Sequence, residues 1–184
     1  MGLLDVACSE SVSVMERTRC SVYDGDILYI GYPFQTYLFF ELPTSVFVTP
    51  LVSARLILFQ IPMQCAGYST QSIQYQVAPL LDFFTIYQGY YAPPRVDERL
   101  QVEYQSQPGV GTSEIDVTEI VTGWINNTPE NKGLLFTGEP YSGYLTYASQ
   151  RYGIAGMRPR LRLVYDGFSW PLRIAPCTVD LQER

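Results

Sequence analysis

Prolines and glycines divide this chain into short stretches in which apolar and polar residues alternate. Alternation with a period of two, together with β-branched and aromatic side chains, is typical of β-strands bounded by turns. The pattern occurs in residues 11–16, 27–32, 36–42, 53–61, 72–78, 100–104, 113–117, 133–138, 144–149 and 160–165. Many short strands separated by turns favour two packed antiparallel sheets. The sequence therefore predicts a mainly all-β, antiparallel, jelly-roll-like β-sandwich.

Two segments refine this prediction. Residues 53–61 are apolar on both faces at their centre, which indicates a central strand or one beneath a covering element. Residues 118–126 instead place apolar side chains at helical spacing, with Asp116 and Glu119 spaced as a capping box before them. We expect this single short helix to close one end of the sandwich. Ten side chains are expected in the core: Leu38, Phe40, Leu56, Leu58, Val117, Val121, Trp124, Leu135, Leu161 and Leu163.

Composition limits the partners of the protein. The chain has 184 residues, which suits one domain with terminal arms, and a net charge of −6, which argues against binding a nucleic-acid backbone. The first 20 residues lack a basic segment followed by a long apolar one. No apolar run approaches the roughly 18 residues of a membrane-spanning helix. We therefore expect no membrane span, and a protein that stays in the cytoplasm or reaches a surface without a visible signal peptide.

The residue types argue against catalysis. The chain has no histidine, which removes the usual Ser-His and Cys-His nucleophile systems and the commonest nitrogen ligand of zinc. A glycosidase needs two carboxyl groups roughly 5–10 Å apart, and no carboxylates are marked as such a pair. Asp97 and Glu98 lie between Arg95 and Arg99 and indicate solvated loop ion pairs. We predict no enzymatic activity, no cofactor and no metal site.

Three segments together resemble the DNRLRE-type domain family. The first is Phe40-Glu41-Leu42-Pro43 followed by Ala54-Arg55-Leu56-Ile57-Leu58, the second spans residues 115–138 with an Asp-Val-Thr helix, a Trp and a Gly-Leu-Leu strand, and the third is Arg158-Pro159-Arg160-Leu161. The resemblance covers about residues 27–165. It implies a sandwich similar to carbohydrate-binding modules of bacterial surface proteins and to propeptides of TGF-β-like growth factors. The hexapeptide that names the family is absent, and no sugar-binding residue can be carried over by position.

Tyrosines gather in two loop-like stretches and leave three interpretations open. The candidates are Tyr87, Tyr90, Tyr91, Tyr141 and Tyr152. Tyrosine rings stack on sugars, they are enriched in subunit interfaces, and they also pack against loops. A glycan site, a subunit interface and simple packing therefore all remain as hypotheses.

The cysteines and the chain ends suggest self-assembly. We divide the chain into an N-terminal arm or strand (1–26), the sandwich (27–167) and a C-terminal arm (168–184), which is too apolar for a disordered tail. Cys8 and Cys177, with Cys20 next, are candidates for a disulfide between subunits, while free thiols are the alternative. Each arm either folds back on its own sandwich or pairs with the sheet edge of a neighbour.

Two functions from different classes follow. The first is a non-catalytic structural subunit that self-assembles through its arms and sheet edges into a surface fibre, spore layer or particle, as a homo-oligomer or polymer. The second is a glycan-binding module of a bacterial surface protein, with a mannose-, uronate- or peptidoglycan-like ligand. Large regular assemblies of the purified protein favour the first, and a monomer retained on polysaccharide favours the second.

Overall fold

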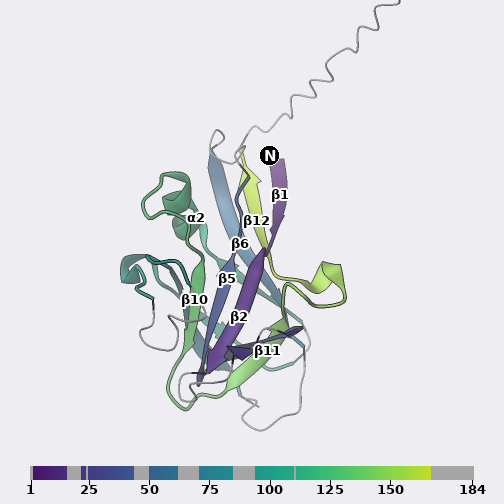
Figure 1. The fold of residues 1–184 in the computed structure, drawn as a ribbon. Coiled ribbons are helices and arrows are strands. Elements are labelled where there is room, and N and C mark those ends of the chain that lie inside the picture. Colours follow the sequence, from purple (N-terminus) through teal and green to yellow (C-terminus); the bar gives the residue numbers. More distant parts are fainter. Residues whose placement is uncertain are drawn as a thin grey trace, which may run out of the picture.

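The computed structural model describes residues 2–15, 22–23, 25–43, 50–61, 71–84, 94–109 and 111–166. Two antiparallel sheets pack face to face (Figure 1). The four-stranded sheet has the order β1 (Gly2–Ala7), β12 (Arg160–Tyr165), β6 (Leu51–Phe59) and β9 (Thr112–Asp116). The six-stranded sheet has the order β3 (Val22–Tyr23), β2 (Glu10–Met15), β5 (Phe34–Phe39), β10 (Leu134–Gly138), β7 (Ile73–Pro79) and β8 (Val102–Ser106). The predicted all-β sandwich is confirmed.

A small third sheet closes one end of the sandwich. It pairs β4 (Ile27–Gly31) with β11 (Tyr144–Ala148). The buried hydroxyls of Ser13 and Thr36 bond to the main chain of Tyr29 in β4, which ties this sheet to the six-stranded one. An isolated bridge between Gln60 and Tyr147 ties it to the end of β6. The third sheet is thus joined to the two large sheets by side-chain hydrogen bonds and one isolated bridge, rather than by a continuous ladder of main-chain hydrogen bonds.

The core lies between the two large sheets and matches the sequence prediction. All ten predicted core residues are buried, and Leu56, Leu58, Val121, Leu161 and Leu163 have no exposed surface. β6 is an internal strand between β12 and β9, and at its centre Leu56 and Leu58 on one face and Ile57 on the other are all buried. The predicted central strand is confirmed.

The predicted helix is also confirmed, with a different cap. α2 (Thr118–Ile125) covers one end of the sandwich (Figure 1) and buries Ile120, Val121 and Trp124. Its N-cap residue is Val117, so the predicted capping box of Asp116 and Glu119 is wrong by one residue. Asp116 instead accepts hydrogen bonds from the Thr118 N–H (2.9 Å) and hydroxyl (2.6 Å). The chain also forms the 3₁₀ helices η2 (Glu98–Leu100) and η3 (Ala155–Met157).

A buried polar cluster crosses the core near the β8–β9 connection. The Tyr147 hydroxyl lies 2.8 Å from the Ser106 hydroxyl and 3.2 Å from that of Ser113. Gln60 donates to the Ser106 hydroxyl (2.9 Å) and to the Gln107 carbonyl oxygen (2.7 Å). Gln60, expected on the same face of β6 as Leu56 and Leu58, is therefore buried and still hydrogen-bonded, as buried polar groups must be.

The N-terminal segment lies within the sandwich rather than beside it. β1 pairs with β12 over six residues, from Gly2 opposite Tyr165 to Ala7 opposite Arg160. β2 then pairs with β5 in the other sheet. Residues 2–15 therefore supply one strand to each sheet, so of the two alternatives for this segment the structure has the one in which it pairs with its own sandwich. The C-terminal arm, residues 168–184, lies outside the described residues.

Candidate functional site

The outer edge of β1 is the first candidate site. β1 is the last strand of its sheet, and no strand of the described ranges lies on its other side. The Cys8 N–H donates to the Pro159 carbonyl oxygen (3.0 Å), which places Cys8 in a hydrogen-bonded pair with β12. Because such pairs alternate along an antiparallel ladder, the main chains of Leu4 and Val6 face β12. The N–H and C=O groups of Leu3, Asp5 and Ala7 therefore face outward along the open edge.

The side chains of β1 leave this edge unprotected. Native edge strands are commonly blocked by charges, proline or bulges. β9, at the opposite edge of the same sheet, exposes Glu114 and Asp116. β1 carries Asp5 as its one charged residue and exposes 65% of the Leu3 side chain. The β1 edge therefore has the features of a strand-pairing surface.

The charge of Asp5 is neutralised by its neighbours on β12. Arg162 donates two hydrogen bonds to the Asp5 carboxylate, at 2.8 and 2.9 Å, and Nε of Arg160 lies 3.7 Å from it. The Arg162 hydrogen bonds lower the pKa of Asp5. Arg55, next across the sheet, pairs with Glu114 at 3.2 Å. The Asp5 carboxylate therefore presents no unpaired negative charge to an approaching strand.

The Cys8 thiol is buried beside this edge. Cys8 is a free cysteine with 8% of its surface exposed, and its Sγ donates to the Glu10 carbonyl oxygen at 3.0 Å. Burial raises the pKa of this thiol to about 12. Its predicted disulfide to a neighbouring subunit does not fit the folded chain, because the thiol is not accessible there. Cys20 and Cys177, the other two candidates, lie outside the described residues.

We expect the Cys8 thiol to resist alkylation in the native protein. In a variant with Cys20, Cys65 and Cys177 replaced by serine, iodoacetamide at pH 8 should react on the order of 1,000-fold more slowly than in 8 M urea, because a pKa of about 12 leaves little thiolate. Mass spectrometry of timed samples measures both rates. Equal rates in buffer and in urea would show that residues 7–10 open readily and that Cys8 is available for cross-linking after all.

A pocket of about 220 Å³ on the outer face of the six-stranded sheet is the second candidate site. It is lined by Glu10, Ser11, Val12, Tyr37, Leu38, Phe39, Leu80, Phe83, Phe84 and Lys132. Phe39 lies opposite Glu10 in the β2–β5 register. The Tyr37 and Phe84 rings stack at 3.7 Å between centroids, and they hold the segment after β7 against the sheet. The pocket thus has an aromatic floor, with a carboxylate and an ammonium group on its lining.

The ammonium group on this pocket is held in place. Lys132 Nζ donates to the Leu81 carbonyl oxygen (3.0 Å), lies 3.4 Å from the Glu130 carboxylate, and stands 5.3 Å from the centre of the Phe83 ring. These contacts fix the Lys132 side chain over the wall of the pocket. Neither Glu10 nor Lys132 was a candidate from the sequence, because they are far apart in the chain and neither belongs to a motif.

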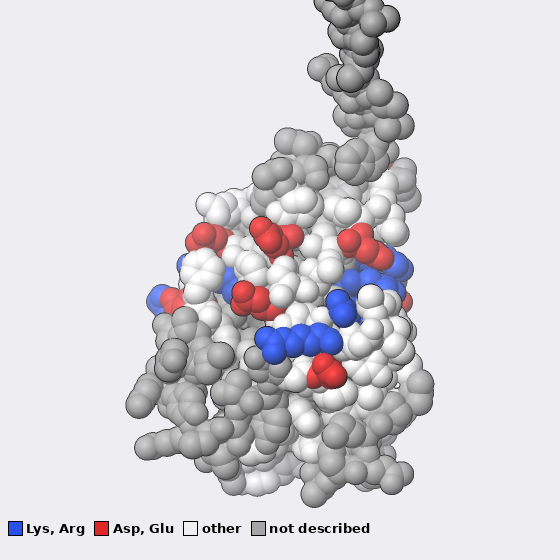
Figure 2. Space-filling model, turned by 45° about the vertical axis from the view of Figure 1, so that its right-hand side comes forward, with Lys and Arg blue, Asp and Glu red and all other residues white. Residues whose placement is uncertain are grey.

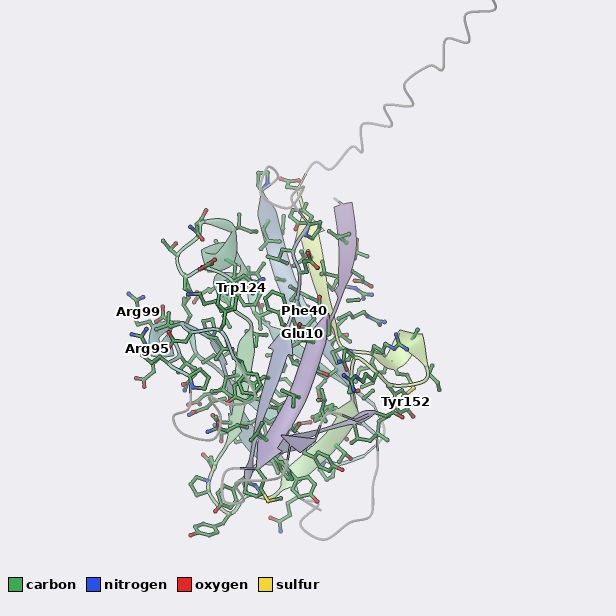
Figure 3. All side chains as sticks on the ribbon, in the orientation of Figure 1. Glu10, Phe40, Arg95, Arg99, Trp124 and Tyr152 are labelled. Carbon is green, nitrogen blue, oxygen red and sulfur yellow. The ribbon has the colours of Figure 1, made fainter. Side chains whose placement is uncertain are left out.

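The two described tyrosine candidates do not form one site. Tyr141 exposes 81% of its surface and its ring lies 5.4 Å from that of Tyr32. Tyr152 is half-buried after the other end of β11 (Figure 3), and neither residue lines the pocket. β11 has five residues, so the two tyrosines are separated by roughly 15 Å of strand. Tyr87, Tyr90 and Tyr91 lie outside the described residues.

The carboxylates with shifted pKa values are not those of a general acid. Arg95 pairs with Asp82 at 2.9 Å and lowers the pKa of that carboxyl to about 2, rather than pairing with Asp97 or Glu98. Arg99 pairs with Asp97 at 2.7 Å and lowers its pKa. Both arginines project from the surface (Figure 3), but Asp97 is buried, which corrects its assignment to a solvated pair. A general acid at neutral pH needs a raised pKa.

Charges are mixed on the face of the molecule that Figure 2 shows. Figure 2 shows basic and acidic side chains interspersed on one face, with no large area of one sign. Among the described residues, no group of three or more Asp, Glu or Cys side chains is placed to hold a metal ion. No helix in the described part of the chain has the length and apolar character needed to cross a membrane.

Comparison with known proteins adds no assignment. Neither a protein-family model nor a curated protein matches the chain. The resemblance to the DNRLRE-type family therefore stays a prediction.

Proposed function

We propose that the protein is a non-catalytic structural subunit that assembles with copies of itself by strand pairing at the edge of β1. The observation that supports this most directly is that the main-chain groups of Leu3, Asp5 and Ala7 face the side of β1 on which no described strand lies. Contacts in which one subunit donates and the next accepts propagate into filaments or layers unless they close into a ring. Such a subunit would build a surface fibre, a spore layer or a particle.

The energetics of one edge contact favour assembly only in repeated arrays. Three residues with one N–H and one C=O group each allow six main-chain hydrogen bonds. At about 0.5–1.5 kcal/mol each, these bonds contribute roughly 3–9 kcal/mol. Association costs about 4–15 kcal/mol in lost freedom of motion. A single contact is therefore weak, and we expect assembly to depend steeply on protein concentration.

A proline at Ala7 tests this proposal. The Ala7 N–H faces the open edge, so Ala7→Pro removes no bond to β12, and proline is tolerated on the outer side of an edge strand. We expect large assemblies of the wild-type chain in sedimentation velocity and negative-stain microscopy. Ala7→Pro should give monomers with an unchanged melting temperature.

Val6→Pro is the matched control for this test. The Val6 N–H faces β12, so this proline removes an internal bond and should lower the melting temperature. A wild-type chain that sediments as a monomer at every concentration would contradict the proposal. Assembly of Ala7→Pro at the wild-type concentration would show that copies associate through another surface.

Glycan binding at the pocket is the second candidate function. Its support is that Phe39, Glu10 and Lys132 line one pocket, because aromatic rings stack on sugars and charged groups bond to their hydroxyls. We expect Phe39→Ala and Glu10→Gln to abolish retention on mannan, alginate or peptidoglycan. Leu3→Lys, at the edge, should leave retention unchanged. Equal retention of all three variants would exclude this pocket as the binding site.

A further inference from the structure

Tyr141 is exposed on a turn whose backbone conformation disfavours it. The Ser142 N–H donates to the Glu139 carbonyl oxygen at 3.2 Å, which closes a turn with Pro140 and Tyr141 at its centre. Tyr141 has a φ of +67°, a conformation that glycine or asparagine normally adopts in such a turn. Its side chain gains little from burial, because 81% of its surface is exposed. Residues held in disfavoured conformations commonly belong to ligand-binding or switch regions.

The surrounding chain holds this tyrosine in place. A Cβ atom at Gly138 would lie 2.4 Å from the Tyr32 nitrogen, so the end of β10 packs directly on the main chain there. A Cβ atom at Gly31 would lie 2.5 Å from the Gly143 carbonyl oxygen. The Tyr32 ring lies 5.4 Å from the Tyr141 ring. The Tyr141 side chain is therefore presented on two turns that fix each other, which lowers the cost of ordering it when it binds.

We infer that the Tyr141 side chain of one copy occupies the pocket on the outer face of the six-stranded sheet of the next copy. This inference rests on the proposed function and gives the assembly a second contact beside the β1 edge. Its basis is the match in size and chemistry between the side chain and the pocket, together with their positions on the sheet.

The pocket has the size and the lining that a tyrosine side chain needs. Its volume is about 220 Å³, whereas an engineered apolar cavity of about 150 Å³ already holds a benzene molecule. Its lining includes Phe39, Leu80 and Phe83, which suit the apolar body of the ring. Glu10 also lines the pocket, and its carboxylate is an acceptor for the phenol O–H.

The pocket and the tyrosine lie at opposite ends of the same strands. Phe39, which lines the pocket, ends β5, whereas Gln35 near the start of β5 lies opposite Thr137 near the end of β10. Tyr141 lies in the turn that follows β10, and five residues of strand span roughly 15 Å. Tyr141 does not line the pocket of its own copy. A contact between two different surfaces at opposite ends repeats head to tail along the strands.

The two contacts extend an assembly in different directions. Pairing at the β1 edge adds copies across the strands, and Tyr141 adds them along the strands. Both together give a layer rather than a single fibre. Because each contact alone is weak, loss of either one leaves monomers at the concentration at which the wild-type chain assembles.

Tyr141→Gly separates this role from a structural one. Glycine adopts a positive φ without strain, so the melting temperature of the variant should not fall. In sedimentation velocity, assembly should require at least about tenfold more protein than for the wild-type chain. Tyr141→Phe, which keeps the ring and loses only the bond to Glu10, should lose less. A lower melting temperature with unchanged assembly would assign Tyr141 to folding alone and contradict the inference.

Photo-cross-linking identifies the surface that receives Tyr141. p-Azidophenylalanine replaces Tyr141 in an isotope-labelled full-length chain, which is mixed with the unlabelled wild-type chain before illumination. Mass spectrometry then identifies the peptides that join two copies. We expect links from position 141 to residues 37–39 or 80–84 of the other copy. The same group at Tyr152, which does not line the pocket, is the control and should give at least about tenfold fewer such links.

The possible outcomes separate this inference from the proposed function. If Tyr141→Gly assembles at the wild-type concentration, or if position 141 links to another surface, this inference is wrong and the proposed function stands. Binding of a mannan oligosaccharide to the pocket of the assembled protein would also contradict it. If Ala7→Pro assembles and Tyr141→Gly does not, this inference stands and strand pairing at β1 is wrong. If the wild-type chain stays monomeric at every concentration, both are wrong.

Discussion

Replacing Gly138 by alanine is expected to lower the free energy of unfolding by about 3 kcal/mol or more. Gly138 ends β10 where this strand crosses β4, and a Cβ atom there would lie 2.4 Å from the Tyr32 nitrogen and 2.6 Å from the Gly31 Cα. These are main-chain atoms, so no side-chain rotation relieves the contact. Gly31 has a φ of +119°, which lies outside the range of an ordinary β-strand. The main chain at Gly31 therefore cannot shift away simply by adopting regular strand geometry. Urea denaturation followed by circular dichroism measures the loss.

Gly153→Ala is the matched control for this prediction. A Cβ at Gly153 meets nothing within 4 Å, and we expect a change of less than about 0.5 kcal/mol. If Gly138→Ala were as stable as Gly153→Ala, β10 and β4 would not approach each other as closely as described. The third sheet would then be packed more loosely against the six-stranded one.

Trp124→Ala is expected to lower the free energy of unfolding by about 3–5 kcal/mol. Trp124 exposes 2% of its surface and belongs to the main core cluster together with Phe40 (both labelled in Figure 3). Removing the indole leaves a cavity where α2 covers the end of the sandwich. Guanidinium denaturation by far-UV circular dichroism provides the measurement.

Two further variants separate packing from hydrogen bonding at this position. The indole Nε1 is buried without a hydrogen-bond partner among the described residues, so Trp124→Phe loses volume but no bond and should cost less than half as much as Trp124→Ala. Thr122→Ala, on the exposed face of the same helix, should be nearly neutral. A loss at Trp124→Phe equal to that of Trp124→Ala would indicate that the indole N–H is bonded after all.

The fold could be predicted because burial follows local periodicity. The centre of residues 53–61 is apolar on both faces, and Leu56, Ile57 and Leu58, which point to alternate faces of β6, are all buried. Residues 160–165 alternate because Leu161 and Leu163 face the core while Arg160 and Arg162 face solvent. In both segments the pattern of apolar residues follows the pattern of buried side chains. The sequence therefore predicts which side chains are buried. The helix at Trp124 follows for the same reason.

The sequence pattern did not predict the strand β1, because only half of its side chains are buried. Val6 and Cys8 are buried and Leu4 partly so, while Leu3 and Asp5 face outward, and Leu3 breaks the alternation that marks a strand. The alternation of Leu4, Val6 and Cys8 was the available signal. The sequence contains no pattern that shows which residues distant in the chain lie close together in the fold. Glu10 and Lys132 meet at one pocket only because β2 and β10 flank β5, and single-sequence patterns do not contain such strand order.

The pairing of β1 with β12 also sets the order in which the molecule can be completed. Gly2 lies opposite Tyr165, so the contacts between these strands have a large sequence separation. Contacts of this kind form late, and during synthesis the N-terminal part leaves the ribosome first. The β1 edge becomes ordered only when β12 has been made. If the protein assembles as proposed, this edge is available to neighbouring copies only after residue 165 has been synthesised.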